Sequence, residues 1–342
     1  MNAAELVEVV LPGKVEPEGL LIRHGAVPAA GPGQVVIRME ATGVSFAEQQ
    51  MRRGRYYDQP PFPFVPGYDV VGTVLATGDG VDPGLAGTRV AALVKVGGWA
   101  SHVVVEAADV VEVPEGISAA QAETMVVNGV TAWQMLHRKA RVRAGRTILV
   151  HGANGGVGSV LADLALAAGV KVIGTASARH HDTLRRRGVV PVDYRADVAA
   201  RVRELAPGGV DAVFDHVGGR GIVASWRLLA PGGTLVSYGS ASTRDDDGSK
   251  QWPVLKLLAR VWLWNALPNR RRAYFFNVWA GRALARNAFR ARLRADLTQV
   301  FAALRRGDVT ARIAAELPLA RVADAMRLAE SGTVAGKIVL TP

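Results

Sequence analysis

The stretch at residues 148–177, ILVHGANGGVGSVLADLALAAGVKVIGTAS, decides the fold. It opens with the apolar run 148–150, which is typical of a buried parallel strand. Glycines follow, and after them apolar residues recur at helical spacing, at Val157, Leu161, Leu164 and Ala168. A second apolar run, 170–174, completes a strand–helix–strand unit. The stretch therefore predicts a glycine turn between a strand of a parallel sheet and the helix that follows it.

The glycine turn has the composition of a phosphate-binding loop. A helix start leaves free N–H groups and carries about half an elementary positive charge. Because glycine has no side chain, a phosphate can approach those N–H groups closely. We therefore predict that Gly155, Gly156 and Val157 contact a dinucleotide, and that Gly158 lets the helix pack closely on the sheet. The alternative is a glycine-rich turn that holds no ligand.

The residues after the second strand favour NADPH over NADH. An NAD site usually has an acidic residue about 20 residues after the glycines, where it holds the ribose 2′-hydroxyl. This chain instead has Ser177 and Arg179, which can hydrogen-bond to and pair with a 2′-phosphate. Tyr194 and Arg195, after the next strand, are expected to complete the pocket. In the alternative interpretation, the two arginines are solvated surface charges.

The alternation of strands and helices continues beyond this unit. Residues 210–219 and 232–240 each contain an apolar strand followed by a glycine-containing loop. Such alternation predicts a doubly wound parallel sheet, in which ligands bind at the carboxyl ends of the strands. We therefore expect Val217, Gly239 and Ser240 to line the path of the cofactor.

The first 120 residues have a different pattern. Four segments rich in valine are separated by glycine and proline, at residues 34–44, 70–78, 88–94 and 100–106. This pattern predicts an all-β, barrel-like domain in addition to the α/β domain.

Composition excludes several classes of protein. The chain has 342 residues, which predicts two domains, and a hydrophobic content of 49%, which argues against disorder. It has no cysteine, so disulfides, cysteine–zinc sites and cysteine nucleophiles are excluded. No apolar run approaches the roughly 20 residues of a membrane span, and the first ten residues lack the basic start of a signal peptide. We therefore expect a cytoplasmic protein.

The net charge of +11 comes from one segment. Residues 248–295 contain eleven lysines or arginines, no acid, and four of the seven tryptophans. The rest of the chain is nearly neutral, so a nucleic-acid partner is not expected. Apolar residues at helical spacing predict a helix here, and three interpretations stay open: a membrane-surface helix, a lid over the substrate channel, or a core-packing helix with a solvated basic face.

Seven motifs resemble, in order and spacing, those of the medium-chain dehydrogenases/reductases. They are GVSFAEQQMRRGRYY (43–57), PFVPGYDVVGTVLATGDGV (63–81), GGWASHVVV (97–105), NGVTAW (128–133), HGANGGVGS (151–159), VDYR (192–195) and GKIVL (336–340). The chain is most similar to the zinc-independent quinone oxidoreductase branch, which includes zeta-crystallin-type and VAT-1-like proteins. The resemblance implies an α/β fold with a GroES-like β-barrel catalytic domain (1–124 and 282–342) and a Rossmann NADPH-binding domain (125–281).

The resemblance also implies an enzyme without a metal. Zinc-dependent members have Gly-His-Glu where this chain has Gly67, Tyr68 and Asp69, and the cysteine-rich zinc loop is missing. Zinc normally needs four N, S or O ligands. Without a metal to polarise oxygen, hydride transfer from NADPH needs an acceptor that is already electrophilic, such as a quinone or an α,β-unsaturated carbonyl compound. The alternative is an NADPH-binding, VAT-1-like membrane-associated protein with little turnover.

Three candidate catalytic residues receive their roles from the resemblance. It places Ser45 beneath the nicotinamide, where many relatives have asparagine. Tyr56 matches a tyrosine that lines the active cleft. Either Tyr56 or its neighbour Tyr57 is expected to donate a proton or a hydrogen bond to a developing enolate, and the alternative is that both form the cleft wall.

The resemblance assigns further residues to the cofactor and to an interface. Asn128 and Thr131 match a segment that holds the nicotinamide ribose and phosphate, and both residue types also suit a helix N-terminus. Lys337 matches a lysine near the pyrophosphate, or is an ordinary strand-edge charge. The segment AYFFNVW (273–279) is predicted to be a strand at the Rossmann sheet edge, which pairs with its copy in a homodimer and so covers an exposed edge.

Overall fold

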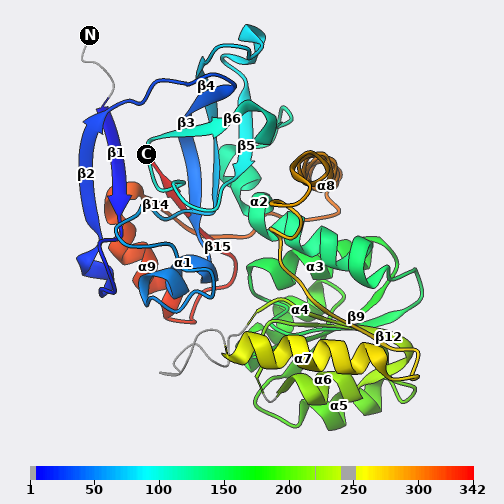
Figure 1. The fold of residues 1–342 in the computed structure, drawn as a ribbon. Helices are drawn as coiled ribbons and strands as arrows, with labels where there is room; N and C mark the ends of the chain where they lie inside the picture. Colours follow the sequence, from blue (N-terminus) through cyan, green and yellow to red (C-terminus); the bar gives the residue numbers. More distant parts are fainter. Residues whose placement is uncertain (1–4, 220, 240–251) are drawn as a thin grey trace. The chain divides into compact units, whose positions relative to one another are not determined.

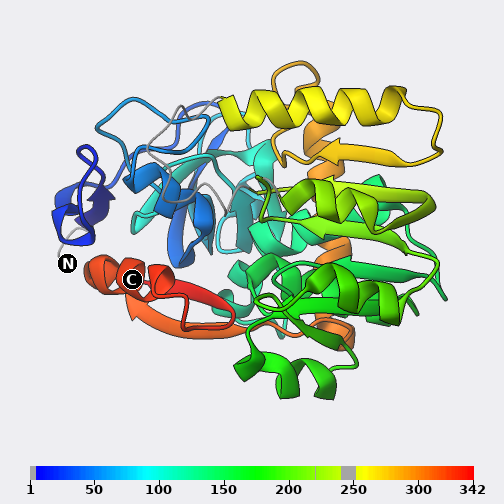
Figure 2. The same ribbon diagram turned by 90° about the horizontal axis from the view of Figure 1, so that it is seen from below.

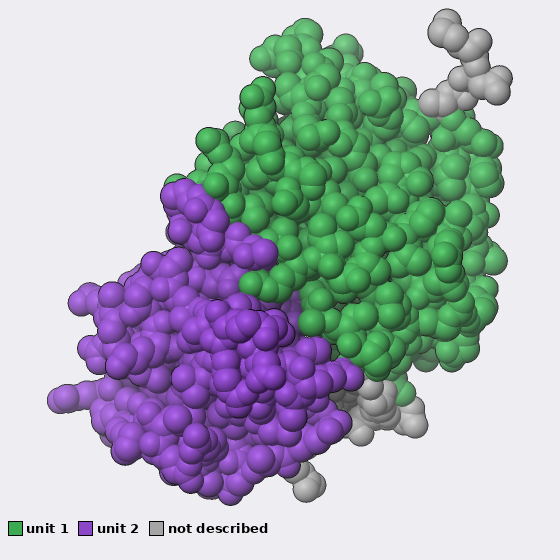
Figure 3. All heavy atoms as spheres, turned by 180° about the vertical axis from the view of Figure 1, so that it is seen from behind, with its two compact units in different colours: residues 1–130, 284–305, 311–342 green, residues 131–283, 306–310 purple. Residues whose placement is uncertain are grey.

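The computed structural model describes residues 5–219, 221–239 and 252–342. The chain divides into two compact units, shown in green and purple in Figure 3. Unit 1 consists of Met1–Val130, Leu284–Arg305 and Ala311–Pro342, and unit 2 of Thr131–Ala283 and Arg306–Thr310. Each unit is described by itself below.

The division between the units lies near the predicted domain boundaries, which stay a prediction. The sequence placed those boundaries at residues 124/125 and 281/282, whereas the units divide at 130/131 and 283/284. The helix α2 (Ala119–Trp133) crosses the first division. Because the backbone stays helical there, no glycine- or proline-rich linker marks the division in the sequence.

Unit 1 is built on a seven-stranded sheet, much of which can be followed in Figure 1. Its strands are β3 (Gln34–Val44), β4 (Asp69–Thr77), β5 (Arg89–Leu93), β6 (His102–Glu106), β7 (Val110–Glu112), β14 (Ile313–Pro318) and β15 (Lys337–Thr341). The order is β14-β15-β3-β4-β5-β7, with β6 paired to β3, and every pair except β14–β15 is antiparallel. The four strands predicted from the valine-rich segments are therefore present, as β3 to β6.

The central strand of this sheet is covered on both faces. Val35, Val36 and Ile37 of β3 follow one another, and each is at most 1% exposed. Successive side chains of a strand point to opposite faces, so a run of three buried residues requires two covering layers. A separate antiparallel pair precedes the sheet in the chain and consists of β1 (Glu5–Val10) and β2 (Leu21–Ala26).

The other helices that belong mainly to unit 1 are α1 (Phe46–Arg52), α8 (Arg286–Arg306) and α9 (Val322–Glu330).

The start of α2 corrects the prediction made for Asn128 and Thr131. The Ser118 hydroxyl accepts a hydrogen bond from the Gln121 N–H at 3.2 Å, and the Gln121 side-chain oxygen accepts one from the Ser118 N–H at 3.0 Å. This reciprocal cap starts the helix well before Asn128 and Thr131. Their predicted place at a helix N-terminus is wrong, and both lie in the helix interior.

Unit 2 contains a six-stranded, all-parallel sheet. Its strands are β8 (Thr147–Val150), β9 (Lys171–Ala176), β10 (Val190–Asp193), β11 (Val210–Asp215), β12 (Leu229–Ser237) and β13 (Arg272–Phe275). The order is β10-β9-β8-β11-β12-β13. The chain moves outward from β8 to β10 and then returns to β11 on the other side of β8, so the β8/β11 boundary is a topological switch point. The predicted doubly wound parallel sheet is confirmed.

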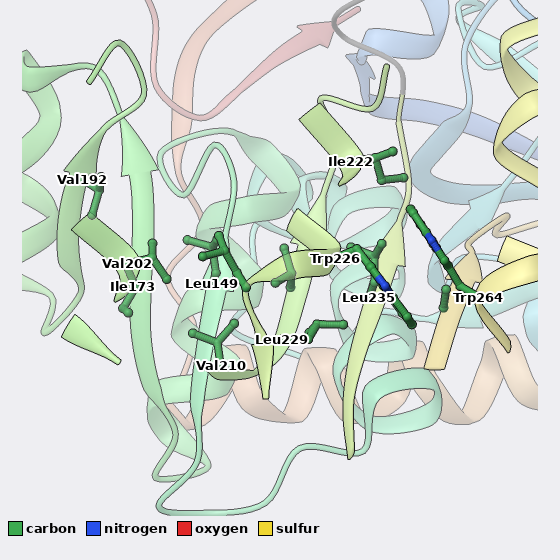
Figure 4. Packing of buried hydrophobic residues seen from close by; sticks show 13 residues of the cluster. Leu149, Ile173, Val192, Val202, Val210, Ile222, Trp226, Leu229, Leu235 and Trp264 are labelled. Carbon is green, nitrogen blue, oxygen red and sulfur yellow. The ribbon is translucent and has the colours of Figure 1, made fainter. Parts of the chain in front are cut away.

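The helices of unit 2 pack on this sheet through apolar residues. They are α3 (Gly156–Ala167), α4 (His181–Arg186), α5 (Val198–Leu205), α6 (Gly221–Arg227) and α7 (Trp252–Ala266). Figure 4 shows one core cluster, which joins Leu149 and Leu235 of the strands to Trp226 of α6 and Trp264 of α7. The two tryptophan rings are stacked, with centroids 4.7 Å apart and planes inclined by 3°. Such an aromatic pair contributes about 0.5–1.5 kcal/mol beyond the area that it buries.

The described residues also form short helical segments. The 3₁₀ segments are η1 (Pro17–Gly19), η2 (Pro83–Leu85), η3 (Ala107–Asp109), η5 (Ala178–His180) and η7 (Leu319–Arg321). The π-helical segment η4 (Gln134–Ala140) continues α2 and ends at Arg141, which has a left-handed backbone conformation.

The helix α7 lies beside β13 at the sheet edge (Figure 2) and has two apolar faces. Leu257, Val261 and Trp264 pack into the core, as the core-packing interpretation predicts. The outward face is not simply basic, because it exposes a set of large apolar side chains: Trp252, Leu255, Leu258, Trp262 and Leu263. Residues 248–251 of the basic segment lie outside the described residues, and the predicted strand 273–279 is present as the shorter β13.

Candidate functional site

The glycine turn follows β8 directly and leads into α3 without a side-chain cap. Gly155 is the N-cap of α3, with an extended backbone and no side chain to accept a hydrogen bond from the first turn. Gly152 has a left-handed φ of +65°, and a Cβ atom there would lie 2.5 Å from the His216 ring. The turn therefore presents the amide groups of Gly156 and Val157 at a helix start, where an anion can take the place of a capping side chain.

Gly158 holds the turn against the helix. A Cβ atom at this position would lie 2.2 Å from the Gly152 carbonyl oxygen and 2.9 Å from its carbonyl carbon. Both atoms belong to the backbone and have little room to move. Gly158 therefore permits a close contact, but with the turn, whereas the sequence predicted a contact with the sheet.

The predicted 2′-phosphate residues lie after the two neighbouring strands β9 and β10. Asp193, the last residue of β10, is in register with Ala176 of β9, so the loops beginning at Ser177 and Tyr194 start side by side. Ser177 is the N-cap of η5, and the Arg179 Nε–H donates to Nε2 of His180 at 3.0 Å. The pKa of His180 is lowered by burial and then by the charge of Arg179.

The second loop carries an aromatic ring and a further arginine. The Tyr194 side chain is 54% exposed, and the guanidinium of Arg195 lies 5.3 Å from the centre of its ring. The carboxylate of Asp193 accepts a hydrogen bond from the Arg195 N–H at 3.0 Å. The two loops therefore present a hydroxyl, two guanidinium groups and a phenol ring at one edge of the sheet.

A buried polar network crosses the switch point of the sheet and was not predicted. His151, after β8, lies within hydrogen-bond distance of Thr175 Oγ1 at 3.3 Å and of Ser225 Oγ at 3.2 Å. The Ser225 hydroxyl donates to Asp215 at 2.7 Å, and the other oxygen of Asp215 accepts from the N–H groups of Val217 and Gly218 at 2.8 and 2.9 Å. The network fixes the loop after β11, where Val217 was predicted to contact the cofactor.

The titration behaviour of this network follows from its burial. Burial lowers the pKa of His151 and of His216, and the carboxylate of Asp215 only partly opposes this. Both imidazoles are therefore neutral at pH 7. In the sequence, an aspartate just before His-Val-Gly-Gly was the available signal, because Asp often accepts from backbone N–H groups two residues on.

The strand β12 ends beside the same loop. A Cβ atom on Gly239 would lie 2.7 Å from the His216 carbonyl oxygen, so this position needs glycine for the close approach of two backbones. Burial raises the pKa of the neighbouring Tyr238, and Asp215 raises it further, so this phenol stays neutral. Ser240, the next predicted cofactor residue, lies outside the described residues.

In unit 1, Ser45 is held at the start of α1. Its hydroxyl accepts from the Ala47 N–H at 3.2 Å and donates to the Glu48 carboxyl group. Glu48 also accepts from the Ser45 N–H at 2.9 Å, which completes a capping box. Burial raises the pKa of Glu48, and the charge of Lys337 opposes that effect. A cap thus accounts for the geometry of Ser45, and its contact with nicotinamide stays a prediction.

The two predicted tyrosines of unit 1 are joined by a third. The hydroxyl groups of Tyr56 and Tyr68 are in hydrogen-bond contact, and their rings are perpendicular, with centroids 6.2 Å apart. The rings of Tyr56 and Tyr57 lie closer, at 4.8 Å. No pattern in the sequence predicted the contact between Tyr68 and Tyr56, because Tyr68 lies in a different segment from the other two tyrosines.

Lys337 lies in a buried cluster of acids within unit 1. Its ammonium is 3.0 Å from Glu123 and 3.4 Å from Asp69, and all three side chains are at most 4% exposed. Burial acts to lower the pKa of Lys337, but Asp69, Glu123 and Glu48 outweigh burial and raise it. Lys337 is therefore no ordinary strand-edge charge, and its predicted place near the pyrophosphate stays a prediction.

Asn128 and Thr131 are buried in α2, on either side of the division between the units. They are 6% and 8% exposed, respectively, and Asn128 belongs to unit 1 whereas Thr131 belongs to unit 2. The structure therefore brings the predicted cofactor residues together in two sets. Unit 2 holds most of them at the carboxyl ends of its strands, and unit 1 holds Asn128 and Lys337 with the three candidate catalytic residues.

Tyr68 and Asp69, which stand where zinc-dependent members bind their metal, have other partners. Among the residues that the structure describes, no group of three or more His, Cys, Asp or Glu side chains is placed to hold a metal ion. Tyr68 contacts Tyr56, and Asp69 is paired with Lys337. Within the described ranges, no helix has both the length and the hydropathy needed to cross a membrane.

Known proteins resemble the chain along nearly its whole length. A family model for the alcohol dehydrogenase GroES-like domain matches residues 31–115, and one for zinc-binding dehydrogenases matches residues 188–340. The synaptic vesicle membrane protein VAT-1 homolog of Rattus norvegicus is 35% identical over 335 residues, which are 94% of this chain and 80% of that protein.

Solved structures agree with this assignment. The structure of mycobacterial Rv1454c complexed with NADPH has a TM-score of 0.82 and 28% identity, and covers 98% of this chain and 100% of that one. A quinone oxidoreductase of Pseudomonas syringae has a TM-score of 0.84 and 28% identity, with the same coverage. The resemblance inferred from the seven motifs is confirmed, and the GroES-like and Rossmann folds with it. The chain belongs to the medium-chain dehydrogenase/reductase family of oxidoreductases, in the branch of the quinone oxidoreductases and VAT-1 homologs.

Proposed function

We propose that this protein is an NADPH-dependent oxidoreductase that transfers a hydride, without a metal, to a quinone or an α,β-unsaturated carbonyl acceptor. One observation carries the proposal: the uncapped start of α3, Ser177 and Arg179 all lie at the carboxyl ends of adjacent parallel strands in unit 2. The complex of Rv1454c with NADPH supports the same cofactor for this chain.

The residues of unit 2 suit each part of NADPH. The amides of Gly156 and Val157 suit the diphosphate, and Ser177 with Arg179 suits the 2′-phosphate. When bound, NADPH supplies the hydride, and the protein contributes binding, orientation and electrostatic stabilisation. Val217, Gly239 and Ser240 are proposed to continue the cofactor path, as are Asn128 and Thr131 of α2.

The proposed class of acceptor follows from the residues that stand where zinc-dependent members bind their metal. Tyr68 and Asp69 stand where zinc-dependent members have histidine and glutamate, and Asp69 is paired with Lys337. This difference supports a metal-free reaction, although one of the two matching family models is described as zinc-binding. A protein that does not polarise oxygen with a Lewis acid suits an acceptor that is already electrophilic. Ser45, Tyr56 and Tyr57 are proposed to lie at the reacting atoms.

The direct test is NADPH oxidation with a panel of acceptors. We expect turnover with 1,4-benzoquinone, phenanthrenequinone or trans-2-nonenal, weaker turnover with NADH, and no effect of EDTA. Saturated alcohols with NADP⁺ should give no reaction. NADPH binding without turnover on the whole panel contradicts the proposed reaction, and inhibition by EDTA contradicts its metal-free character.

Arg179→Ala is expected to weaken NADPH binding selectively. The substitution removes a guanidinium that pairs with the 2′-phosphate, and a charge-assisted hydrogen bond of this kind contributes about 1.5–3 kcal/mol. The Kd of NADPH should therefore rise at least about 10-fold, while that of NADH barely changes, as measured by cofactor fluorescence. Arg203→Ala, at the exposed last turn of α5, is the control and should change neither. Equal losses for both cofactors contradict the assignment of the 2′-phosphate site.

The outward face of α7 favours a second candidate function, that of a membrane-associated NADPH-binding protein with little turnover. Trp262 is 74% exposed and Leu255 54%, and the cation of Lys256 lies on the same helix. Exposed tryptophan and leucine beside lysine are typical of helices that lie in a lipid surface. Sedimentation with phosphatidylserine vesicles, combined with absence of turnover, would favour this candidate over the first.

The sheet edge supports a proposed homodimer. β13 is the last strand of the six-stranded sheet within the chain, paired on one side with β12. On the other side of β13, the Asn265 side chain of α7 already donates to the Ala273 carbonyl oxygen and accepts from the Ala273 N–H, so a strand from a second copy would cover only the rest of this edge. Sedimentation velocity distinguishes a dimer from a monomer, and a monomer at micromolar concentration contradicts the proposal.

The proposed location of the enzyme is the cytoplasm.

A further inference from the structure

Two backbone segments of unit 2 begin side by side at the switch point, the glycine turn after β8 and the loop after β11. The two strands are adjacent and parallel, so both segments start at the same end of the sheet. They are in contact where the His216 ring lies, because a Cβ atom on Gly152 would be 2.5 Å from that ring. In the proposed function, the glycine turn holds the diphosphate and the loop continues the cofactor path. The separation of the two segments therefore matters for cofactor binding.

Thr175 and Asp215 hold these two segments through backbone amides. In the glycine turn, the Gly152 N–H donates to Thr175 Oγ1 at 3.1 Å. In the loop after β11, the Val217 and Gly218 N–H groups donate to Oδ1 of Asp215 at 2.8 and 2.9 Å. The side chains of Thr175 and Asp215 are at most 2% exposed, so water cannot easily replace them as partners. Each segment is thus tied to one buried side chain.

His151 and Ser225 connect the two buried side chains to each other. The His151 ring lies with Nδ1 3.3 Å from Thr175 Oγ1 and with Nε2 3.2 Å from Ser225 Oγ. The Ser225 hydroxyl, in α6, donates to Oδ2 of Asp215 at 2.7 Å. A continuous chain of side chains, which we call the switch-point chain, therefore runs through Thr175, His151, Ser225 and Asp215.

The direction of the hydrogen bonds in the switch-point chain follows from counting protons. Ser225 Oγ has one proton and donates it to Asp215, so His151 Nε2–H must be the donor to Ser225. Burial lowers the pKa of His151, which leaves a single proton on the ring and makes Nδ1 an acceptor. Thr175 can then donate to Nδ1 while it accepts from the backbone. One arrangement satisfies all four side chains, with the His151 proton on Nε2.

We propose that the switch-point chain holds the glycine turn and the loop after β11 at the separation that NADPH needs, and that Thr175, His151 and Ser225 are positioning residues for the cofactor. The proposal rests on the proposed function and deepens it, because it assigns residues that act through the two backbone segments. NADPH and NADH share the diphosphate, so the chain should support the binding of both. Arg179→Ala, in contrast, should affect NADPH alone.

Cofactor binding to variants of Thr175 tests this role. Thr175→Val keeps the shape of the side chain but removes the hydroxyl that holds the glycine turn. The Kd of NADPH and that of NADH should each rise about 10-fold, as expected for the loss of one buried hydrogen bond. Thr175→Ser keeps a hydroxyl and should recover most of the affinity. Thr88→Val, which removes a hydroxyl that donates to the Leu85 carbonyl oxygen in unit 1, is the control and should change neither Kd.

A purely structural role for Thr175 would give a different result. Thr175→Val would then lower the thermal midpoint and leave both Kd values as in wild type, and this outcome overturns the proposal. An equal loss of affinity in Thr175→Ser and Thr175→Val also overturns it, because the hydroxyl would then not be the group that matters.

Breaking the switch-point chain on both sides of His151 tests whether its links act together. Ser225→Ala should also raise the Kd of both cofactors. The double variant Thr175→Val/Ser225→Ala should bind at most about twofold more weakly than the weaker single variant, because one broken link already releases the two segments. If the two losses of affinity multiplied instead, the side chains would act independently, which overturns the proposal.

The tautomer of His151 is a readout that needs no cofactor. The ¹⁵N chemical shifts of its ring, assigned by their loss in His151→Gln, distinguish a proton on Nε2 from one on Nδ1. We expect the proton on Nε2 in the wild type, and a weaker preference for Nε2 in Ser225→Ala. A proton on Nδ1 in the wild type overturns the switch-point chain. Wild-type protein that has the expected tautomer but binds neither cofactor instead contradicts the proposed function.

Discussion

Replacing Lys337 with methionine is expected to lower the free energy of unfolding of unit 1 by about 3–5 kcal/mol, because the change leaves buried carboxyl groups without their cation. The Lys337 ammonium lies 3.0 Å from Glu123 and 3.4 Å from Asp69, and both acids are fully buried. Gly43 makes room for the pair, since a Cβ atom there would lie 2.0 Å from a Glu123 oxygen and 2.2 Å from Lys337 Cε. Hydrogen exchange of peptides covering β3 and β15 measures the loss.

A surface pair of similar geometry is the matched control. Lys95 and Asp58 are 2.5 Å apart, but their side chains are 36% and 51% exposed. Exposed pairs contribute about 0–1 kcal/mol, so Lys95→Met should have little effect. Combining Lys337→Met with Glu123→Gln should restore part of the lost stability. Equal effects of Lys337→Met and Lys95→Met would contradict the role assigned to the buried cluster.

The same cluster predicts how stability changes with pH. Burial raises the pKa of Glu48 and of Glu123 above the ordinary value of 4.5, and Lys337 opposes this effect in both. A folded state with raised carboxyl pKa binds more protons than the unfolded state, so its stability falls as the pH rises above that value. Removing Lys337 should steepen the fall, to at most about 1.4 kcal/mol per pH unit for each proton retained. A slope as in wild type would contradict this linkage.

The spacing of apolar residues and glycines predicted those parts of the fold that depend on residues close together in the chain. The apolar runs of β8 and β9 and the glycines between them lie within one stretch of thirty residues, and their strand–helix–strand order was predicted correctly. The start of α2 was missed because Asn128 and Gly129 look like a break in the helix. Gly129 instead makes room for another segment: a Cβ atom there would lie 2.5 Å from the Val300 side chain of α8. Packing between distant segments is invisible in a single window of sequence.

The candidate site shows the same limit. Ser177 and Arg179 could be proposed because each follows a predicted strand. The cluster around Lys337 could not, because its members come from β15, β4 and α2, which are far apart in the chain. Only the paired register of β3, β4 and β15 brings those segments together. The long-range pairing of a sheet thus positions the buried polar groups that local sequence leaves unassigned.

Gly158→Ala is expected to damage both stability and cofactor use. Alanine favours a helix over glycine by up to about 1 kcal/mol, but its Cβ would lie 2.2 Å from the Gly152 carbonyl oxygen and 3.2 Å from Ala153 Cα. These are backbone atoms, so the helix and the turn must move apart, at a cost of about 1–3 kcal/mol. The movement also displaces the amides proposed to hold the diphosphate. A misplacement of about 1 Å can cost 100-fold in rate, so kcat/KM for NADPH should fall to that extent.

Gly221→Ala provides the matched control. Gly221 begins α6 in the same unit, and a Cβ atom there would meet no atom within 4 Å. Its substitution should leave NADPH kinetics unchanged, and by helix propensity should not lower the thermal midpoint. If Gly158→Ala matched this control in both measurements, the turn would not need its close backbone contact, and the placement of the diphosphate against the start of α3 would be contradicted. Loss of stability with normal NADPH kinetics would contradict only the placement of the diphosphate.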